Sequence, residues 1–246
     1  MLLDIAGKPL ILHTLERAKS AKTVDRVIVA TDDERIANVV RDAGGEAVMT
    51  SPDHQSGSDR IAEVAKDLPA NSIIINVQGD EPVLPPETID VAVNALFNDP
   101  HADMSTTCEP ITELWPELLN GNVVKVVVGD NGYALYFSRS PMPWPREASL
   151  RYDGDPNKAI EAEPELLRDH YRKHTGLYVY RREFLLEYAS WPQTELEKWE
   201  MLEQLRALEH GAKIRVVEAA GTSIGVDTEE DLERVRAILE QEAGAA

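Results

Sequence analysis

The stretch SIIINVQGDEP at residues 72–82 places the most apolar run of the chain directly before a cluster of polar residues. A short β-branched run without polar alternation, such as residues 72–77, is typical of a buried strand. Gly79 lets the backbone approach a ligand, and Asp80 then faces the crevice beyond the carboxyl end of the strand. Asp80 is therefore a candidate metal ligand, although an ordinary turn aspartate explains the same residue.

Helical and strand-like segments alternate on both sides of this strand. Strands separated by helices of about 10–15 residues predict parallel pairing. We therefore expect an α/β fold with a doubly wound, mostly parallel sheet, and ligands beyond the carboxyl ends of its strands. In this half of the chain the expected helices are residues 10–21, 34–42, 57–67 and 87–97, and the further strands are residues 26–30 and 47–49.

The pattern changes after residue 102, where strand-like segments follow one another with turn residues between them. Residues 123–128, 134–138 and 176–180 predict an antiparallel insertion at about 122–181, within a single domain that spans residues 1–246. The proline-rich and charged stretch 141–164 predicts a mobile loop over the site. Residues 196–209 and 229–241 are the last two expected helices.

The overall charge and composition exclude several classes of partner. A formal net charge of −19 repels a phosphate backbone, so we expect no nucleic acid partner. No apolar run approaches the length of a membrane span, so we expect no membrane partner. The single cysteine, Cys108, agrees with a cytoplasmic protein. An anionic substrate would need a metal ion or local arginines to overcome this background charge.

The candidate partner of Asp80 is Asp227, in the sequence GVDT at residues 225–228. Mg²⁺ takes one or two protein carboxylates beside substrate phosphates, so two aspartates brought together are enough for a magnesium site. The alternative is that Asp227 or Thr228 caps the helix that follows.

A polar run at residues 54–60, HQSGSDR, leads into an expected helix. Its backbone N–H groups, with Ser56 and Arg60, could hold a nucleotide phosphate or base. An ordinary capped helix start is the alternative.

Five further residues could recognise a sugar. His174 and Tyr178 lie on the last expected strand, where a histidine or a tyrosine can contact a ligand or form a structural hydrogen bond. Residues 196–206, LEKWEMLEQLR, place Glu200, Glu203 and Gln204 on neighbouring turns of one expected helix. Such a ridge suits a polyol, but a solvated acidic face gives the same pattern.

In combination, several segments along nearly the whole chain resemble the 3-deoxy-manno-octulosonate cytidylyltransferases, also called CMP-Kdo synthetases. The similar segments are residues 4–9 (DIAGKP), 27–32 (VIVATD), 53–57 (DHQSG), 76–82 (NVQGDEP), 133–139 (YALYFSR), 200–206 (EMLEQLR) and 225–228 (GVDT). The resemblance implies a nucleotide-diphospho-sugar transferase-like fold, a homodimer, and transfer of CMP from CTP to Kdo with release of pyrophosphate, for lipopolysaccharide biosynthesis.

The same resemblance implies a role for each matching residue. Asp80 and Asp227 correspond to magnesium ligands, and Ser56, Arg60 and Gln78 to part of the nucleotide pocket. The residues that it implies as sugar contacts are Gln78, His174, Tyr178, Glu200, Glu203 and Gln204. Metal-assisted phosphoryl transfer needs mainly positioning and electrostatics, and these residue types can supply both.

The sequence departs from the family at its start. The family opens with an apolar strand and a Ser-x-Arg-Leu-Pro-Gly-Lys loop that binds the CTP phosphates, whereas Lys8 here matches a later Gly-Lys-Pro. We therefore expect translation to begin upstream of Met1. A degenerate copy without turnover is the alternative.

Other functions remain open at this point. The nearest is cytidylyl transfer to 8-amino-Kdo; a sialic acid fits less well, because residues 133–139 and 200–206 resemble the Kdo enzymes. A homologue that binds the sugar without turnover is a hypothesis from a different class.

Overall fold

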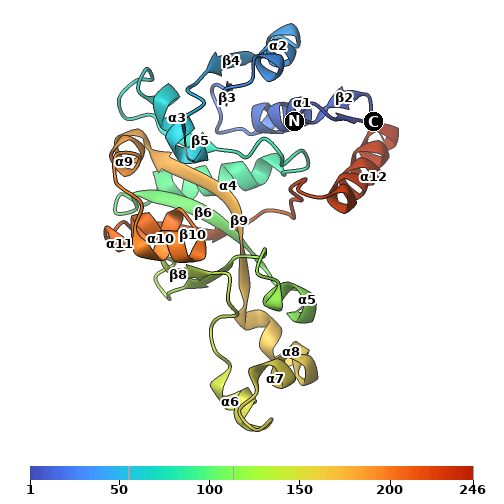
Figure 1. Cartoon of the computed structure of the whole chain (residues 1–246), viewed down its shortest axis with the longest axis vertical. Coiled ribbons are helices and arrows are strands. Elements are labelled where there is room, and N and C mark those ends of the chain that lie inside the picture. Colours follow the sequence, from blue (N-terminus) through green and yellow to red (C-terminus); the bar gives the residue numbers. More distant parts are fainter. Residues whose placement is uncertain (55, 113, 246) are drawn as a thin grey trace.

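The computed structural model describes residues 1–54, 56–112 and 114–245. Figure 1 shows a broad body with a narrow arm that projects from it. Strands and helices alternate through the first half, which confirms the predicted α/β fold, and the main sheet is mixed. Within the described residues, no helix has the length and apolar character needed to cross a bilayer.

The first part of the body is a hairpin, a helix and a small parallel sheet. Strands β1 (Asp4–Ile5) and β2 (Lys8–Pro9) form the hairpin that leads into α1 (Leu10–Ser20). Strands β3 (Ile28–Thr31) and β4 (Glu46–Met49) pair in parallel through α2 (Glu34–Asp42). The side chain of Asp33 accepts a hydrogen bond from the N–H of Arg35 and so caps α2.

The main sheet has six strands, and its order is β10–β6–β9–β7–β8 with β5 also paired to β9. Among its described strands, β6 and β10 are the only pair that runs in parallel. Its strands are β5 (Ile73–Asn76), β6 (Met104–Pro110), β7 (Lys125–Val128), β8 (Ala134–Ser138), β9 (Arg172–Arg181) and β10 (Ile214–Glu218).

The long strand β9 organises this sheet because it changes neighbours along its length. Its first residues pair with β6 and β7, and its last residues pair with β6 and β5. The register slips between Thr106 and Cys108, and Gly176 has a φ of 79°, a conformation that glycine adopts without strain.

Helices cover both faces of the sheet, as the side-chain alternation of β9 requires. Leu177 and Val179 pack in the same apolar cluster as Leu96 of α4 (Pro86–Phe97). Tyr178 and Tyr180 face the opposite way, into a cluster that includes residues of α3 (Gly57–Ala65), α9 (Arg182–Tyr188) and α11 (Gln204–Glu209).

The expected helix at residues 196–209 is interrupted. Helix α10 (Glu195–Glu200) ends at Met201, whose φ of 53° is left-handed, and α11 begins at Gln204. A left-handed residue turns the chain away from the helix axis, so Glu200 and Glu203 do not lie on one continuous ridge.

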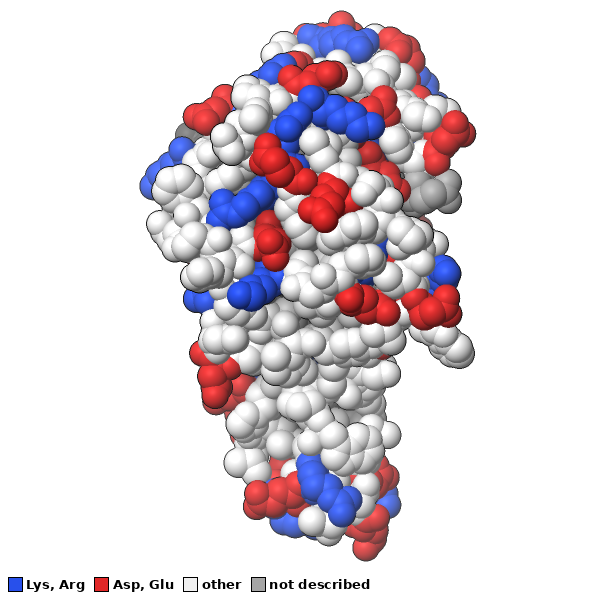
Figure 2. Space-filling model, turned by 90° about the vertical axis from the view of Figure 1, so that its left-hand side faces the viewer, with Lys and Arg blue, Asp and Glu red and all other residues white. Residues whose placement is uncertain are grey.

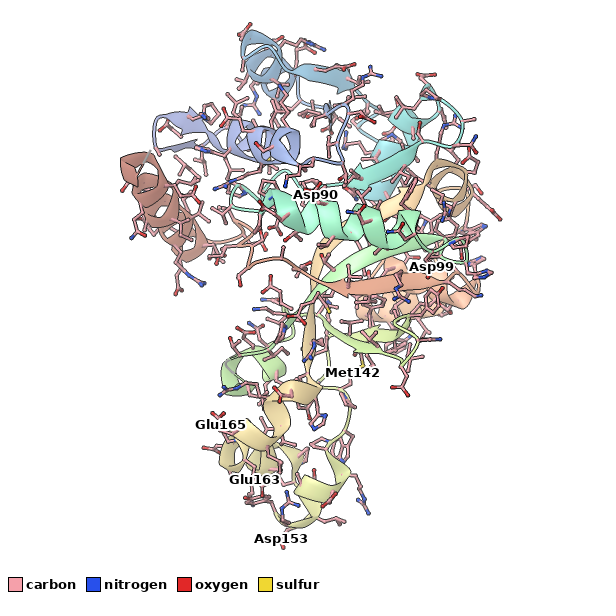
Figure 3. All side chains as sticks on the ribbon, turned by 180° about the vertical axis from the view of Figure 1, so that it is seen from behind. Asp90, Asp99, Met142, Asp153, Glu163 and Glu165 are labelled. Atoms are coloured by element: carbon pink, nitrogen blue, oxygen red, sulfur yellow. The ribbon has the colours of Figure 1, made fainter. Side chains whose placement is uncertain are left out.

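The arm corrects a second expectation. Residues 141–164 do not form a loop over the site: they contain α6 (Arg146–Leu150) and α7 (Pro156–Ala162). With α5 (Leu114–Leu119) and α8 (Pro164–Leu167), these helices enclose a small apolar core of their own, and the 3-10 helix η1 (Arg168–His170) follows α8. Figure 3 places Asp153, Glu163 and Glu165 in this arm, and Glu163 accepts hydrogen bonds from Arg151 and Tyr152.

The C-terminal helix returns to the start of the chain. Helix α12 (Glu229–Ala245) packs Val235 and Leu239 against Ile5 and Leu10. In Figure 1 the two termini accordingly lie on the same side of the body.

A groove with a volume of about 1010 Å³ separates the small sheet from the main sheet. Within the described residues, β3 pairs only with β4 and β5 pairs only with β9, so the edges of β3 and β5 both line the groove. Its lining is largely apolar and includes Ile11, Leu15, Val29, Ile61, Ile75 and Val93.

Candidate active site

The structure brings Asp80 and Asp227 together. The N–H of Val226 donates a 2.9 Å hydrogen bond to the carbonyl oxygen of Asp80, which fixes the 225–227 segment beside the end of β5. Burial raises the pKa of the Asp80 carboxyl group, and the neighbouring Asp227 carboxylate raises it further. A carboxylate pair in which the charge of one partner raises the pKa of the other, here Asp80, is an arrangement that a divalent cation stabilises.

Two further carboxyl groups surround this pair. The pKa of Glu81 is raised to about 7, mainly by burial, and the carboxylates of Asp80, Glu109 and Asp227 also raise it. The hydrogen bond that Glu81 accepts from the Ser223 hydroxyl acts in the opposite direction. Lys173 lies 3.7 Å from the Glu109 carboxylate. Sequence reasoning missed Glu81 and Glu109. Glu81 could have been found from its place beside Asp80, whereas Glu109 has no comparable local signal.

A pair of carboxylates is a partial coordination sphere. Among the described residues, no group of three or more histidine, cysteine, aspartate or glutamate side chains is arranged to hold a metal ion. Mg²⁺ commonly completes its six ligands with water and substrate phosphate oxygens, so Asp80 and Asp227 fit this metal better than one that needs an all-protein cage.

The start of α3 lies next to Glu203. Ser56 is the N-cap residue and accepts a 3.2 Å hydrogen bond from the N–H of Asp59, and the Ser58 hydroxyl donates to Glu203 at 2.8 Å. Burial raises the pKa of Glu203, whereas the hydrogen bonds from Ser58 and Ser56 lower it. The second carboxylate oxygen of Glu203, Oε2, is buried without a hydrogen-bond partner among the described residues.

Arg60 is held at the carboxyl ends of the small sheet. Its guanidinium donates a 2.6 Å hydrogen bond to the hydroxyl of Thr50, which follows β4, and lies 3.4 Å from the carboxylate of Asp32, which follows β3. These contacts hold the positively charged Arg60 guanidinium at the sheet edge where ligands of α/β proteins bind.

Strand β9 carries His174 and Tyr178 on the side of the sheet opposite α4. The Nε2 atom of His174 lies 2.8 Å from the Thr106 hydroxyl, and its ring centroid lies 5.1 Å from that of Tyr178. Burial lowers the pKa of His174 to about 4, so its imidazole is neutral near pH 7 and one ring nitrogen can accept a hydrogen bond.

Glu200 has a different setting from Glu203. Its two carboxylate oxygens accept hydrogen bonds from the Ser138 hydroxyl at 2.6 Å and from the N–H of Arg139 at 3.0 Å. Glu200 therefore anchors the end of β8 to α10. Gln204 begins α11 and is buried, whereas Gln78 is exposed beside the groove.

With this geometry established, comparison with known proteins identifies the family. The model of the family described as Cytidylyltransferase matches residues 1–214. The protein of Trichlorobacter lovleyi named 3-deoxy-manno-octulosonate cytidylyltransferase is 51% identical over 240 residues, which cover 98% of this chain and 92% of that protein. The chain belongs to the 3-deoxy-manno-octulosonate cytidylyltransferase family.

Other members of the cytidylyltransferase family agree in sequence and in structure. The Geobacter sulfurreducens protein of the same name is 53% identical over 234 residues, covering 95% of this chain and 90% of that protein. A solved CMP:2-keto-3-deoxy-manno-octonic acid synthetase in complex with CTP superposes with a TM-score of 0.85 at 43% identity, and covers 98% of this chain and 91% of that one.

A more distant solved structure agrees with the fold alone. A 4-diphosphocytidyl-2C-methyl-D-erythritol synthase from Anaerococcus prevotii superposes with a TM-score of 0.61 at 15% identity, covering 97% of this chain and 92% of that one.

Proposed function

We propose that this protein transfers CMP from CTP to Kdo, giving CMP-Kdo and pyrophosphate for lipopolysaccharide biosynthesis. The observation that carries the proposal is the meeting of Asp80 and Asp227 at the carboxyl end of β5, in a chain whose relatives are named for this reaction. In the transfer, the anomeric oxygen of the sugar forms a bond to the α-phosphorus of CTP. The bond between that phosphorus and the bridging oxygen breaks, pyrophosphate leaves, and the hydroxyl proton passes to solvent.

Mg²⁺ is the proposed cofactor, with Asp80 and Asp227 as its protein ligands. The like charge of the two carboxylates and the raised pKa of Asp80 support a bound cation between them. When bound, the metal ion withdraws charge from the phosphate oxygens and aligns them for displacement. The chain itself contributes the hydrogen bond between Val226 and Asp80, which holds the two carboxylates together before any ligand arrives.

The remaining predicted site residues are proposed to bind the two substrates. Ser56, Arg60 and Gln78 lie near the start of α3 or beside the groove and suit the nucleotide. The proposed sugar contacts are Gln78, His174, Tyr178, Glu200, Glu203 and Gln204. Of these, Glu203 has the strongest structural support, because its buried Oε2 atom has no hydrogen-bond partner among the described residues and a sugar hydroxyl could donate to it.

Pyrophosphate release from CTP, Kdo and Mg²⁺ tests the activity directly. We expect release that requires all three components, with mass spectrometry identifying CMP-Kdo as the product. The same assay with 8-amino-Kdo and with a sialic acid tests the choice of sugar, and Kdo should have the highest kcat/KM. Binding of Kdo by a folded sample that releases no pyrophosphate would contradict the enzyme and favour a homologue that only binds the sugar.

We also propose a homodimer. Figure 2 shows one face on which charged side chains gather over the upper body and the tip of the arm, with few between them. Several large apolar residues are exposed, including Leu135 on β8 at 62% and Trp144 in the arm at 59%. Exposed apolar groups of this size are typical of subunit contacts. Sedimentation equilibrium at micromolar concentration should give twice the chain mass, and a monomer would contradict the proposal.

The cytoplasm is the proposed location. A single cysteine, Cys108, which is buried, agrees with a reducing compartment. Fractionation of producing cells should place CTP-dependent activity with cytoplasmic markers, whereas activity among periplasmic markers would contradict this.

A further inference from the structure

Asn76 is a buried residue of β5 whose side-chain amide nitrogen has no hydrogen-bond partner among the described residues. Asn76 is the last residue of β5 and is 4% exposed, and its Nδ2 atom is buried. Leaving a buried amide N–H without a partner costs about 1–3 kcal/mol, so such a group in a folded protein needs an explanation. A ligand that accepts a hydrogen bond from the Asn76 amide group would be such an explanation.

Two other groups of hydrogen-bond donors face the same point. A Cβ atom on Gly57 would lie 3.8 Å from Asn76 Nδ2 and 3.8 Å from Gln78 Nε2. Gly57 is the first residue of α3, a helix of 9 residues. Ser56 accepts hydrogen bonds from the N–H groups of Asp59 and Arg60, so the donors that the start of this helix offers a ligand are the N–H groups of Gly57 and Ser58. The amide groups of Asn76 and Gln78 and the first turn of α3 together form what we call the amide cradle.

The chemistry of the amide cradle favours an anionic oxygen group. Its contributors are N–H donors, and a helix N-terminus adds partial positive charge. Gly57, Asn76 and Gln78 all line the groove between β3 and β5, so a ligand that enters the groove lies next to them. A carboxylate and a phosphate both have this chemistry.

The position of Asn76 in the sheet favours the sugar as the source. Asn76 pairs with Tyr178 of β9, whose ring lies beside that of His174, and both are proposed sugar contacts. We propose that Asn76, with Gln78 and the N–H groups of Gly57 and Ser58, binds the carboxylate of the acidic sugar substrate, beside the Ser56 and Arg60 side chains that are proposed for the nucleotide. This inference rests on the proposed function and adds Asn76 to it as a residue that distinguishes acidic sugars from neutral ones.

Calorimetry without nucleotide tests the proposal with Kdo and with its methyl ester, which lacks the negative charge. Wild-type protein should bind Kdo more tightly than the ester. Asn76→Asp places a negative charge in the amide cradle and should weaken Kdo binding by about tenfold or more, with CTP binding changed by less than about twofold. Asn76→Ala should reduce the preference for acid over ester. Asn38→Asp, at an exposed position of α2, is the matched control and should change neither the affinity for Kdo nor the preference for the acid over the ester.

Each outcome decides the assignment, provided that thermal unfolding shows the variants to be folded. If Asn76→Asp does not fold, Asn76→Ala alone decides it. Unchanged Kdo binding by the folded variants would overturn the proposal, as would weakened CTP binding with unchanged Kdo binding, which would assign the amide cradle to a phosphate. Failure of the proposed function can be told apart from failure of this inference. A wild-type protein that does not transfer CMP could still prefer Kdo to its ester and lose that preference when Asn76 is replaced. Conversely, an active enzyme could show no such preference and no effect of the substitution.

Discussion

The main-chain N–H of Val226 donates a hydrogen bond to the carbonyl oxygen of Asp80, and this 2.9 Å contact joins two segments that are far apart in the sequence. It acts on backbone atoms alone, so it leaves the carboxylates of Asp80 and Asp227 free to face a ligand. The position of the second carboxylate therefore depends on the fold of the segment between β10 and α12 and not on the ionisation of either side chain.

Loss of either aspartate should abolish most of the activity. For Asp80→Asn and Asp227→Asn we expect kcat/KM to fall about 100-fold or more, because electrostatic stabilisation of the reacting phosphate is lost. Unfolding temperatures should change little, since each substitution also removes repulsion between two carboxylates. Steady-state kinetics over a Mg²⁺ titration measures the effect. Asp67→Asn, at an exposed position, is the control, and wild-type activity in Asp80→Asn would refute the prediction.

His174 should make the protein less stable in acid. Its pKa falls from the ordinary 6.5 to about 4 on burial, so the folded state binds fewer protons than the unfolded state between these pH values. The stability associated with neutral His174 is complete above pH 6.5 and is lost as the pH falls towards 4. Urea unfolding across this range should show a smaller loss for His174→Gln than for wild type. His101→Gln, at an exposed site, should follow wild type, and parallel curves for all three would contradict the prediction.

The ion pair between Arg206 and Glu197 should be important for stability. Both side chains are 4% exposed, and Arg206 Nε donates to Glu197 at 2.8 Å. Removing one partner leaves a buried charge uncompensated, so Arg206→Met should lower the free energy of unfolding by about 3–5 kcal/mol. Denaturant titration measures this. The exposed pair of Lys198 and Glu195 is the control, and Glu195→Gln should cost no more than about 1 kcal/mol. Similar losses in both variants would refute the prediction.

The backbone amides of β3, a strand whose edge lines the groove, should exchange their hydrogens faster than those of β6 at the centre of the main sheet. Within the described residues β3 has a strand neighbour on one side only, whereas β6 lies between β9 and β10. Amides without a ladder partner open at lower free energy, so exchange in β3 should be at least about tenfold faster than in β6. Hydrogen exchange followed by mass spectrometry measures both, and equal protection would contradict the expectation.

The elements with a clear local pattern could be predicted from the sequence. Residues 34–42 and 134–138 have the predicted bounds, because a capped amphipathic helix and an apolar, aromatic run near a glycine turn depend on neighbouring residues. Asp80 and Asp227 could be proposed as a pair because Asp80 directly follows Gly79 after an apolar strand and Asp227 lies two residues after Gly225, before an expected helix.

Features that depend on distant contacts could not be predicted in this way. Strand β6 contains polar residues such as Ser105 and Thr106, which are buried because β9 and β10 flank them. The arm has the composition of a loop, and its helices are stabilised by a core that includes Ile111 and Tyr171 from outside residues 141–164. Nothing local marks the Asn76 amide nitrogen as lacking a partner among the described residues, because that property depends on α3 and β9.

The path of β9 has a consequence for regulation. The strand leaves the arm at Arg172, passes through His174 and Tyr178, and ends in the main sheet at Arg181. One continuous strand therefore joins the arm to the wall that we propose for the sugar pocket. If a second subunit holds the arm, the free energies of subunit association and of sugar binding become linked, and the linkage is reciprocal. The apparent affinity for the sugar would then depend on protein concentration, without any dedicated effector site.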